Sequence, residues 1–189
     1  MPTKYSPLSK LASAVFLTAI AAGIAVMWSN SSEKARHLRM VPAGLGISQV
    51  IYAREESWGF GPGGNETGLI VFELPVEVAS NLERQGIRFL DQYMPDEVAV
   101  RRSSSSHIPF RWKGTPVPVE GSDDDANSTL SYDIGKYLNR YGFGLSIDKE
   151  VARDINHALS SQGNFVDDDG RRLIILMPKA AELVVAYRG

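Results

Sequence analysis

The feature that most constrains this chain is an uncharged run near its N-terminus, residues 11–28, which reads LASAVFLTAIAAGIAVMW. At about 1.5 Å per residue, a helix of this length spans about 27 Å, close to the roughly 30 Å hydrocarbon core of a bilayer. A helix also satisfies its own backbone hydrogen bonds, which lipid cannot do. The run therefore predicts a transmembrane signal-anchor over residues 10–29 that contacts the lipid bilayer through residues 11–28.

Two other interpretations of this run stay open. Ala19-Ile20-Ala21 has the A-x-A pattern of a signal-peptide cleavage site, and cleavage after Ala21 would release a secreted protein. A buried core helix is the other interpretation, which the lack of a polar face disfavours. Basic residues flank the run almost equally on both sides, so the orientation is chosen because the run is like a signal sequence. We expect a cytoplasmic N-terminus and an extracytoplasmic domain.

The composition excludes several kinds of site. The chain contains no cysteine, which rules out disulfides, thiolate metal sites and a cysteine nucleophile. Residues 1–29 hold two lysines and no acidic residue, so the remainder carries 18 basic and 22 acidic residues and a formal charge of −4. This mild acidity argues against a nucleic-acid partner, which favours a clustered basic face. A disulfide-free exported domain suggests a bacterial envelope, and we expect a periplasmic location.

The hydrophobic pattern divides the chain into four parts. Residues 1–9 form a short N-terminal tail ahead of the anchor at 10–29. Residues 30–46 are rich in serine and glycine near their ends, which predicts a flexible juxtamembrane linker. Residues 47–189 have the apolar content and length of one soluble domain that can bury its own core.

Four apolar segments at the two ends of this domain have the length and composition of strands. Residues 47–56 and 69–74 form one pair across a glycine-rich loop, which predicts a long-looped hairpin. Residues 173–177 and 182–187 form a second pair after the turn signal Asp167-Asp-Asp-Gly170, which predicts a C-terminal hairpin. The sequence alone does not show whether the two hairpins share a sheet.

Helical patterns lie between the two hairpins. A helix with Pro75 in its first turn is predicted to end at Gly86, and residues 87–94 predict a second short helix. Residues 95–129 are the least regular part, with a possible strand around Ile108–Lys113.

Two further helices follow the irregular part. Apolar residues from Ile134 to Tyr141 recur with helical spacing, with Ser131 as N-cap and Gly142 at the end. A helix over 147–159 has Asp148 near its positive end. The chain is therefore expected to be α+β, an N-terminal transmembrane helix followed by one domain with a mainly antiparallel sheet and three to four helices.

The glycine-rich loop is the best candidate for a binding site. Gly59, Gly61 and Gly64 formally match G-x-G-x-x-G, but a strand follows rather than the helix that a dinucleotide site requires, so no cofactor is expected. A second aromatic-glycine segment begins at Tyr141. Such segments can line a pocket, whereas the alternative is that the glycines serve tight turns and the rings cover the edge of the core. The residues proposed to bind a ligand are Trp58, Phe60, Gly61, Gly63, Gly64, Asn65, Tyr141 and Phe143.

The sequence predicts neither a catalytic set nor a metal site. His107 follows four serines without a nucleophile elbow, and the three histidines show no ligand spacing. The aspartates at 123–125 and 167–169 do not fit a calcium loop, so solvated turns are favoured. Glu55, Glu56 and Glu66 surround the glycine loop and leave a carboxylate-based hydrolase open.

Together these patterns favour a non-enzymatic, single-pass envelope protein. Its extracytoplasmic domain would bind a protein partner or small ligand through the loop at residues 58–67. A membrane-tethered hydrolase that acts on an envelope substrate is the first alternative. A structural subunit of a membrane complex is the second, and it would require a contiguous exposed apolar patch.

Overall fold

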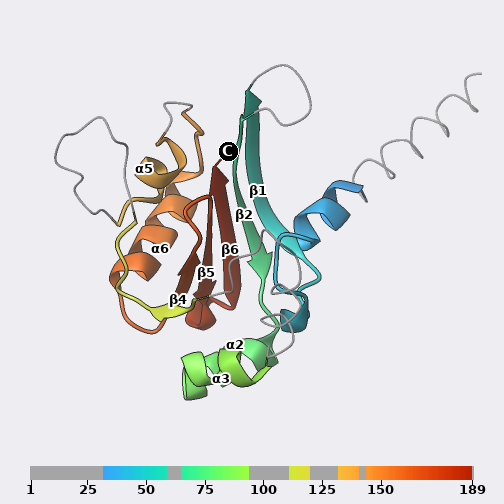
Figure 1. Ribbon diagram of the computed structural model, residues 1–189, viewed down its shortest axis with the longest axis vertical. Coiled ribbons are helices and arrows are strands. Elements are labelled where there is room, and N and C mark those ends of the chain that lie inside the picture. Colours follow the sequence, from blue (N-terminus) through green and yellow to red (C-terminus); the bar gives the residue numbers. More distant parts are fainter. Residues whose placement is uncertain (1–31, 59–64, 94–110, 120–131, 141–143, 189) are drawn as a thin grey trace, which may run out of the picture. The chain divides into compact units, whose positions relative to one another are not determined.

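The computed structural model describes five stretches of the chain, residues 32–58, 65–93, 111–119, 132–140 and 144–188 (Figure 1). The chain separates into two units, Met1–Arg39 and Met40–Gly189. In the first unit, residues 32–38 are helical. The second unit holds all of the strands and the remaining described helices.

The centre of the second unit is a six-stranded sheet in which every neighbouring pair is antiparallel. The N-terminal and C-terminal hairpins are both present, and the second strand of one pairs with the second strand of the other, so they share the sheet. An α+β domain with a mainly antiparallel sheet is therefore confirmed. The order across the sheet is β1 (Val50–Trp58), β2 (Asn65–Glu73), β6 (Glu182–Arg188), β5 (Arg172–Met177), β4 (Phe165–Asp168) and β3 (Lys113–Gly114).

Helices lie beside one face of the sheet and at one of its ends (Figure 1). α5 (Ile134–Leu138) and α6 (Lys149–Ser160) lie over the face, while α2 (Val76–Gln85) and α3 (Ile87–Tyr93) lie at the end. Short 3-10 helices occur at η1 (Ala43–Leu45) and at η2 (Pro178–Ala180), which joins β5 to β6.

The helix predicted around Pro75 is confirmed as α2, with Pro75 as its N-cap rather than in its first turn, and it ends where the sequence indicates. Gly86 has φ 62° and ψ −144°, a backbone conformation open mainly to glycine, and its amide donates to Leu82 O at 2.9 Å. The chain can therefore turn sharply and begin α3 at the next residue.

The main core lies between the sheet and the pair α5 and α6. Leu69 of β2, Ile175 of β5 and Val184 of β6 project from this face, because alternate residues of a strand point to the same side. They pack with Tyr137 of α5 and Leu159 of α6, and all five side chains are fully buried or nearly so. Burial of such side chains stabilises the fold by about 1.5–3 kcal/mol each.

The opposite face of the three central strands is buried as well. Ile70, Phe72, Ile174, Leu176 and Val185 have no exposed surface. Burial on both sides explains why β2, β5 and β6 are continuous apolar runs rather than alternating ones.

A ring-over-glycine contact joins β2 to β6 on this opposite face. Gly68 lies directly across from Tyr187, and a Cβ at position 68 would lie 2.5 Å from the Tyr187 ring. The Tyr187 ring therefore occupies the space that any side chain at 68 would need. Its hydroxyl reaches β1 and donates to Glu55 Oε1, so one tyrosine links three strands.

Three sequence predictions need correction. The turn placed at Asp167–Gly170 is in part a strand, because β4 includes Asp167 and Asp168. The N-cap of α5 is Asp133, whose carboxylate accepts from Gly135 N at 2.9 Å, and Ser131 lies outside the described residues. This helix also ends at Leu138, one turn before Tyr141, because Asn139 turns its side chain to accept from Leu145 N instead.

The membrane prediction concerns a part of the chain that the structure does not describe. Residues 11–28 lie outside the described stretches. Within those stretches, no helix is long and apolar enough to cross a bilayer.

Candidate functional site

The residues predicted to bind a ligand through the glycine loop lie mainly outside the described stretches. Trp58 ends β1 and Asn65 begins β2, and their backbones face each other in the hairpin register. The residues between them, and those of the second aromatic-glycine segment up to Gly144, are not described; they include Phe60, Gly61, Gly63, Gly64, Tyr141 and Phe143.

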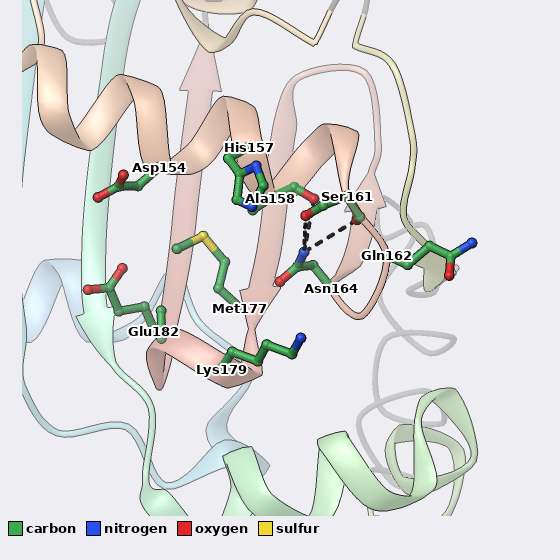
Figure 2. A pocket seen from close by; sticks show the side chains of 10 residues that line it. Asp154, His157, Ala158, Ser161, Gln162, Asn164, Met177, Lys179 and Glu182 are labelled. Carbon is green, nitrogen blue, oxygen red and sulfur yellow. Dashed lines mark hydrogen bonds between the residues drawn. The ribbon is translucent and has the colours of Figure 1, made fainter.

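A cleft of about 350 Å³ opens beside α6, on the helix-covered face of the sheet. Its walls come from α6 and the turn after it, from η2 and from the first residue of β6 (Figure 2). A volume of this size holds a small molecule of several heavy atoms. The lining residues are Asp154, His157, Ala158, Ser161, Gln162, Asn164, Met177, Lys179, Ala180 and Glu182.

One side of α6 supplies the upper wall of the cleft. Asp154, His157, Ala158 and Ser161 follow the spacing i, i+3, i+4 and i+7, which places them on a single stripe of a helix. Ala158 is buried against the core, while Asp154 and His157 are exposed at the cleft. The stripe therefore places one apolar residue between polar ones.

Asn164 is the most buried polar residue of the cleft, with only 9% of its surface exposed. Its amide nitrogen donates to Ala158 O at 3.0 Å and lies 3.5 Å from Ser161 O. Only the NH₂ end of an amide can donate to a carbonyl, so these bonds fix which end is oxygen. Figure 2 shows the remaining oxygen directed toward Met177, into the cleft. No described residue donates a hydrogen bond to that oxygen.

Backbone contacts hold Asn164 in this position. The main-chain N–H of Asn164 donates to Thr115 Oγ1 at 3.2 Å, and the main-chain carbonyl of Asn164 accepts from Thr115 N at 2.9 Å. Thr115 Oγ1 also donates to Ser161 O. The acceptor oxygen is therefore preorganised by two segments of the chain, the one that holds Thr115 and the C-terminal end of α6.

Two carboxylates lie at one end of the cleft. In Figure 2, Asp154 of α6 and Glu182 of β6 approach each other from opposite walls. Burial raises the pKa of Glu182, and the nearby charge of Asp154 raises that pKa further. The Asp154 carboxylate forms a solvent-exposed ion pair with its neighbour, with 3.3 Å between Asp154 Oδ1 and Arg153 Nε. No described residue forms an ion pair with Glu182.

The floor and the opposite end of the cleft have a different character. Met177 is 4% exposed and forms an apolar floor, because β5 ends here and its side chain shares a face with Glu182. Ala181 takes φ 53° to close η2, and this turn carries Lys179. Lys179 is exposed, and Figure 2 shows its ammonium group directed away from Glu182. The cleft thus has an acidic end, an apolar floor and a basic rim.

A second polar cluster lies in the core and contains a tyrosine hydroxyl with no hydrogen-bond partner in the described residues. Tyr137 has no exposed surface, and burial, followed by the charge of Asp168, raises its pKa. The Arg188 guanidinium lies 4.1 Å from the centre of the Tyr137 ring and donates to Gly170 O and Tyr137 O. The Arg188 charge is thereby compensated, whereas the Tyr137 hydroxyl is not.

The carboxylates predicted around the glycine loop do not enter the cleft. Glu55 is partly buried on β1 and accepts from Tyr187, Glu56 is partly buried, and Glu66 is exposed on β2. His107 lies outside the described stretches. Among the described residues, no group of three or more acidic or histidine side chains is placed to hold a metal ion.

Exposed large apolar side chains occur on several elements of the second unit. Ile51 is on β1, Val76 on α2, Tyr93 on α3, and Tyr132 precedes α5. These four residues lie on different parts of the chain, and the structural-subunit hypothesis stays a prediction.

Sequence reasoning missed the cleft, although one signal was present. On one side of α6, polar residues lie before and after Ala158. From the helix sequence alone, however, His157 is only a residue that points away from the core. Glu182 and Asn164 carry no local pattern that distinguishes them from other strand and turn residues. Their importance follows from the β5–β6 register and from the turn after α6.

Comparison of the whole chain with protein-family models, with curated proteins and with solved structures finds no match.

Proposed function

We propose that this chain is a membrane-anchored envelope protein whose extracytoplasmic domain binds a small ligand in the cleft beside α6. The uncharged run of residues 11–28 supports the anchor. The observation that carries the binding function is Asn164, which is nine-tenths buried and presents an unpaired carbonyl oxygen to the cleft. No described residue bonds that oxygen, so a ligand donor can bond it without displacing a protein partner.

The cleft is proposed in place of the loop at residues 58–67 because its walls lie within the described residues and are buried and hydrogen-bonded. Met177 and Ala158 are at least 95% buried, and Asn164 is held by bonds to two segments. Binding in a preformed site of this kind avoids the cost of rearranging its walls.

The binding function is tested by nuclear magnetic resonance on the full-length chain in detergent micelles. The probe is the methyl group of Met177, assigned by Met177→Leu and titrated with a fragment library of neutral, cationic and anionic compounds. We expect a subset of fragments to shift the Met177 signal in a saturable manner. The Met40 methyl group, which does not line the cleft, should stay unchanged.

A blocking variant distinguishes the cleft from other surfaces. Ala180→Trp places an indole at the rim of the cleft from an exposed position in η2 and should abolish the shifts. Ala43→Trp is the matched control, because Ala43 is an exposed alanine in the 3-10 helix η1, away from the cleft. If no fragment shifts Met177, or if both variants behave alike, the proposed function is wrong.

The anchor is tested separately by flotation of the full-length chain with phosphatidylcholine liposomes. Ile20→Asp near the middle of the run should move the chain out of the lipid fraction, because a central acidic residue costs about 2.5–3.5 kcal/mol on insertion. Ile20→Leu should float like the original chain. Recovery of the original chain in the lipid-free fraction, with residues 1–30 still attached, would refute the anchor.

A membrane-tethered hydrolase remains the second candidate function, and one observation favours it. The pKa of Glu182 is raised by burial and then by Asp154, so this carboxyl retains its proton to higher pH than usual and could serve as a general acid. Against a nucleophilic mechanism, no described hydrogen bond joins the His157 ring to Ser161. If a substrate is found, Glu182→Gln should abolish turnover even at saturating substrate.

A further inference from the structure

Three hydrogen-bond acceptors line the cleft beside α6, two at its acidic end and one on the other side of Met177 (Figure 2). Asn164 presents its carbonyl oxygen, and Glu182 and Asp154 present carboxylates at the acidic end. A ligand that satisfies them must supply donors rather than acceptors, because two acceptors brought together repel. This argument rests on the proposed function, since it concerns the ligand of that same cleft.

The charges around Glu182 are predominantly negative. Asp154 faces it from α6, and Glu73 lies directly across from it on β2. Like charges placed opposite each other on neighbouring strands are destabilising. The nearest basic residue of the cleft, Lys179, is directed toward the other end. A cation bound at the acidic end would therefore reduce the repulsion among these three carboxylates, which no described residue reduces.

The apolar surfaces of the cleft indicate that the cation also carries a hydrocarbon group. Met177 forms the floor, and Ala158 and Ala180 complete the apolar lining. A thioether and two methyl groups favour contact with a short hydrocarbon chain. The volume of about 350 Å³ is far larger than a single hydrated ion requires.

We propose that the ligand of the cleft is a small organic cation, an aliphatic primary ammonium ion. Its N–H groups donate to Glu182 and Asp154 at the acidic end, and its hydrocarbon chain lies on Met177, toward Asn164. A primary ammonium carries three donors, so it can bond both carboxylates of the acidic end at once.

The test compares three probes of equal chain length on the full-length chain in non-ionic detergent at about pH 8, well above the ordinary pKa of a carboxyl group. The probes are n-butylammonium, 1-butanol and butyrate, each titrated at constant ionic strength while the Met177 methyl signal is followed. We expect n-butylammonium to bind at least about tenfold more tightly than either of the others, because charge-assisted hydrogen bonds are the stronger ones.

Two substitutions locate the ammonium group. Glu182→Gln keeps the size of the side chain and removes its charge, and should weaken n-butylammonium binding about tenfold or more. Glu150→Gln is the matched control, because Glu150 is an exposed residue of α6 that does not line the cleft. This control should change the affinity by less than about twofold, as expected for a distant surface charge.

The outcomes separate this inference from the proposed function. Tighter binding of butyrate or 1-butanol than of n-butylammonium would refute the cationic ligand and leave the cleft a binding site. An equal loss of affinity in Glu182→Gln and Glu150→Gln would also refute the assignment of the ammonium to the acidic end. If no library fragment shifts Met177 either, then the proposed function itself fails.

Discussion

Two tyrosines of this domain have opposite hydrogen-bonding states. The hydroxyl of Tyr137 is buried under α5 without a partner among the described residues, whereas the hydroxyl of Tyr187 donates to Glu55. A buried polar group without a partner costs about 1–3 kcal/mol, while a satisfied one contributes about 0.5–1.5 kcal/mol. The same chemical group therefore has opposite effects on stability at the two positions.

This contrast predicts opposite effects of the same substitution. Tyr137→Phe should raise the free energy of unfolding by about 1 kcal/mol, because it removes the unpaired hydroxyl and keeps the ring beneath Arg188. Tyr187→Phe should lower it by about 1 kcal/mol. Urea titration followed by circular dichroism measures both. A loss of stability in Tyr137→Phe would show that its hydroxyl has a partner, such as a buried water.

At the scale of single residues, the sequence identified positions with strong backbone signals and missed positions defined by their neighbours. Gly86 could be predicted because a glycine after a helical pattern ends helices through its own backbone. Asn164 could not, because its importance comes from Ala158 and Thr115, which reach it from other elements.

At the scale of elements, the junction of β2 and β6 depends on the absence of a side chain. Gly68→Ala would place a methyl group 2.5 Å from the Tyr187 ring, so the ring must move and its bond to Glu55 must weaken. We expect a loss of about 1–3 kcal/mol in the free energy of unfolding, typical of overpacking. Urea titration provides the measurement.

Two further variants test whether this loss of stability comes from the contact with the Tyr187 ring. Gly114→Ala is the matched control, because Gly114 is also a strand glycine and a Cβ there would contact nothing within 4 Å. It should be neutral or slightly stabilising, since alanine has less conformational freedom to lose. In a Tyr187→Ala background, Gly68→Ala should cost much less. An unchanged cost in that background would contradict the ring contact.

Elements with regular periodicity were predictable, and elements defined by pairing were not. α6 and the C-terminal hairpin follow clear helical and strand patterns, and both are confirmed. β4 was missed because Asp167 and Asp168 favour turns, and only its pairing with β5 makes this segment a strand. Asp167 is accommodated there because its carboxylate accepts from Arg111 N at 2.5 Å.

At the scale of the whole domain, strand order determines where the candidate site forms. β6 is the last strand in the sequence but lies between β2 and β5, which brings Glu182 under α6 and next to Glu73. Such long-range pairing is invisible to local patterns, because each strand pattern is compatible with several neighbours. The sequence could predict an antiparallel sheet with helices, but not the cleft that this order creates.

Strand order also predicts how local stability is distributed. β6 has a neighbour on each side and its residues from Leu183 to Ala186 have no exposed surface, whereas β1 pairs only with β2 and exposes Ile51. Amides of β6 should exchange with solvent only through global unfolding, which typically costs about 5–15 kcal/mol. Many β1 amides should exchange through local opening.

Hydrogen exchange of the full-length chain at increasing guanidinium concentration tests this prediction. The exchange of β6 amides should accelerate steeply with denaturant, because global unfolding exposes the most surface. The exchange of β1 amides should be faster and almost independent of denaturant. Equal protection of β1 and β6 would mean that the outer edge of β1 is covered by another segment or by a second chain, because an open strand edge leaves its amides accessible to water.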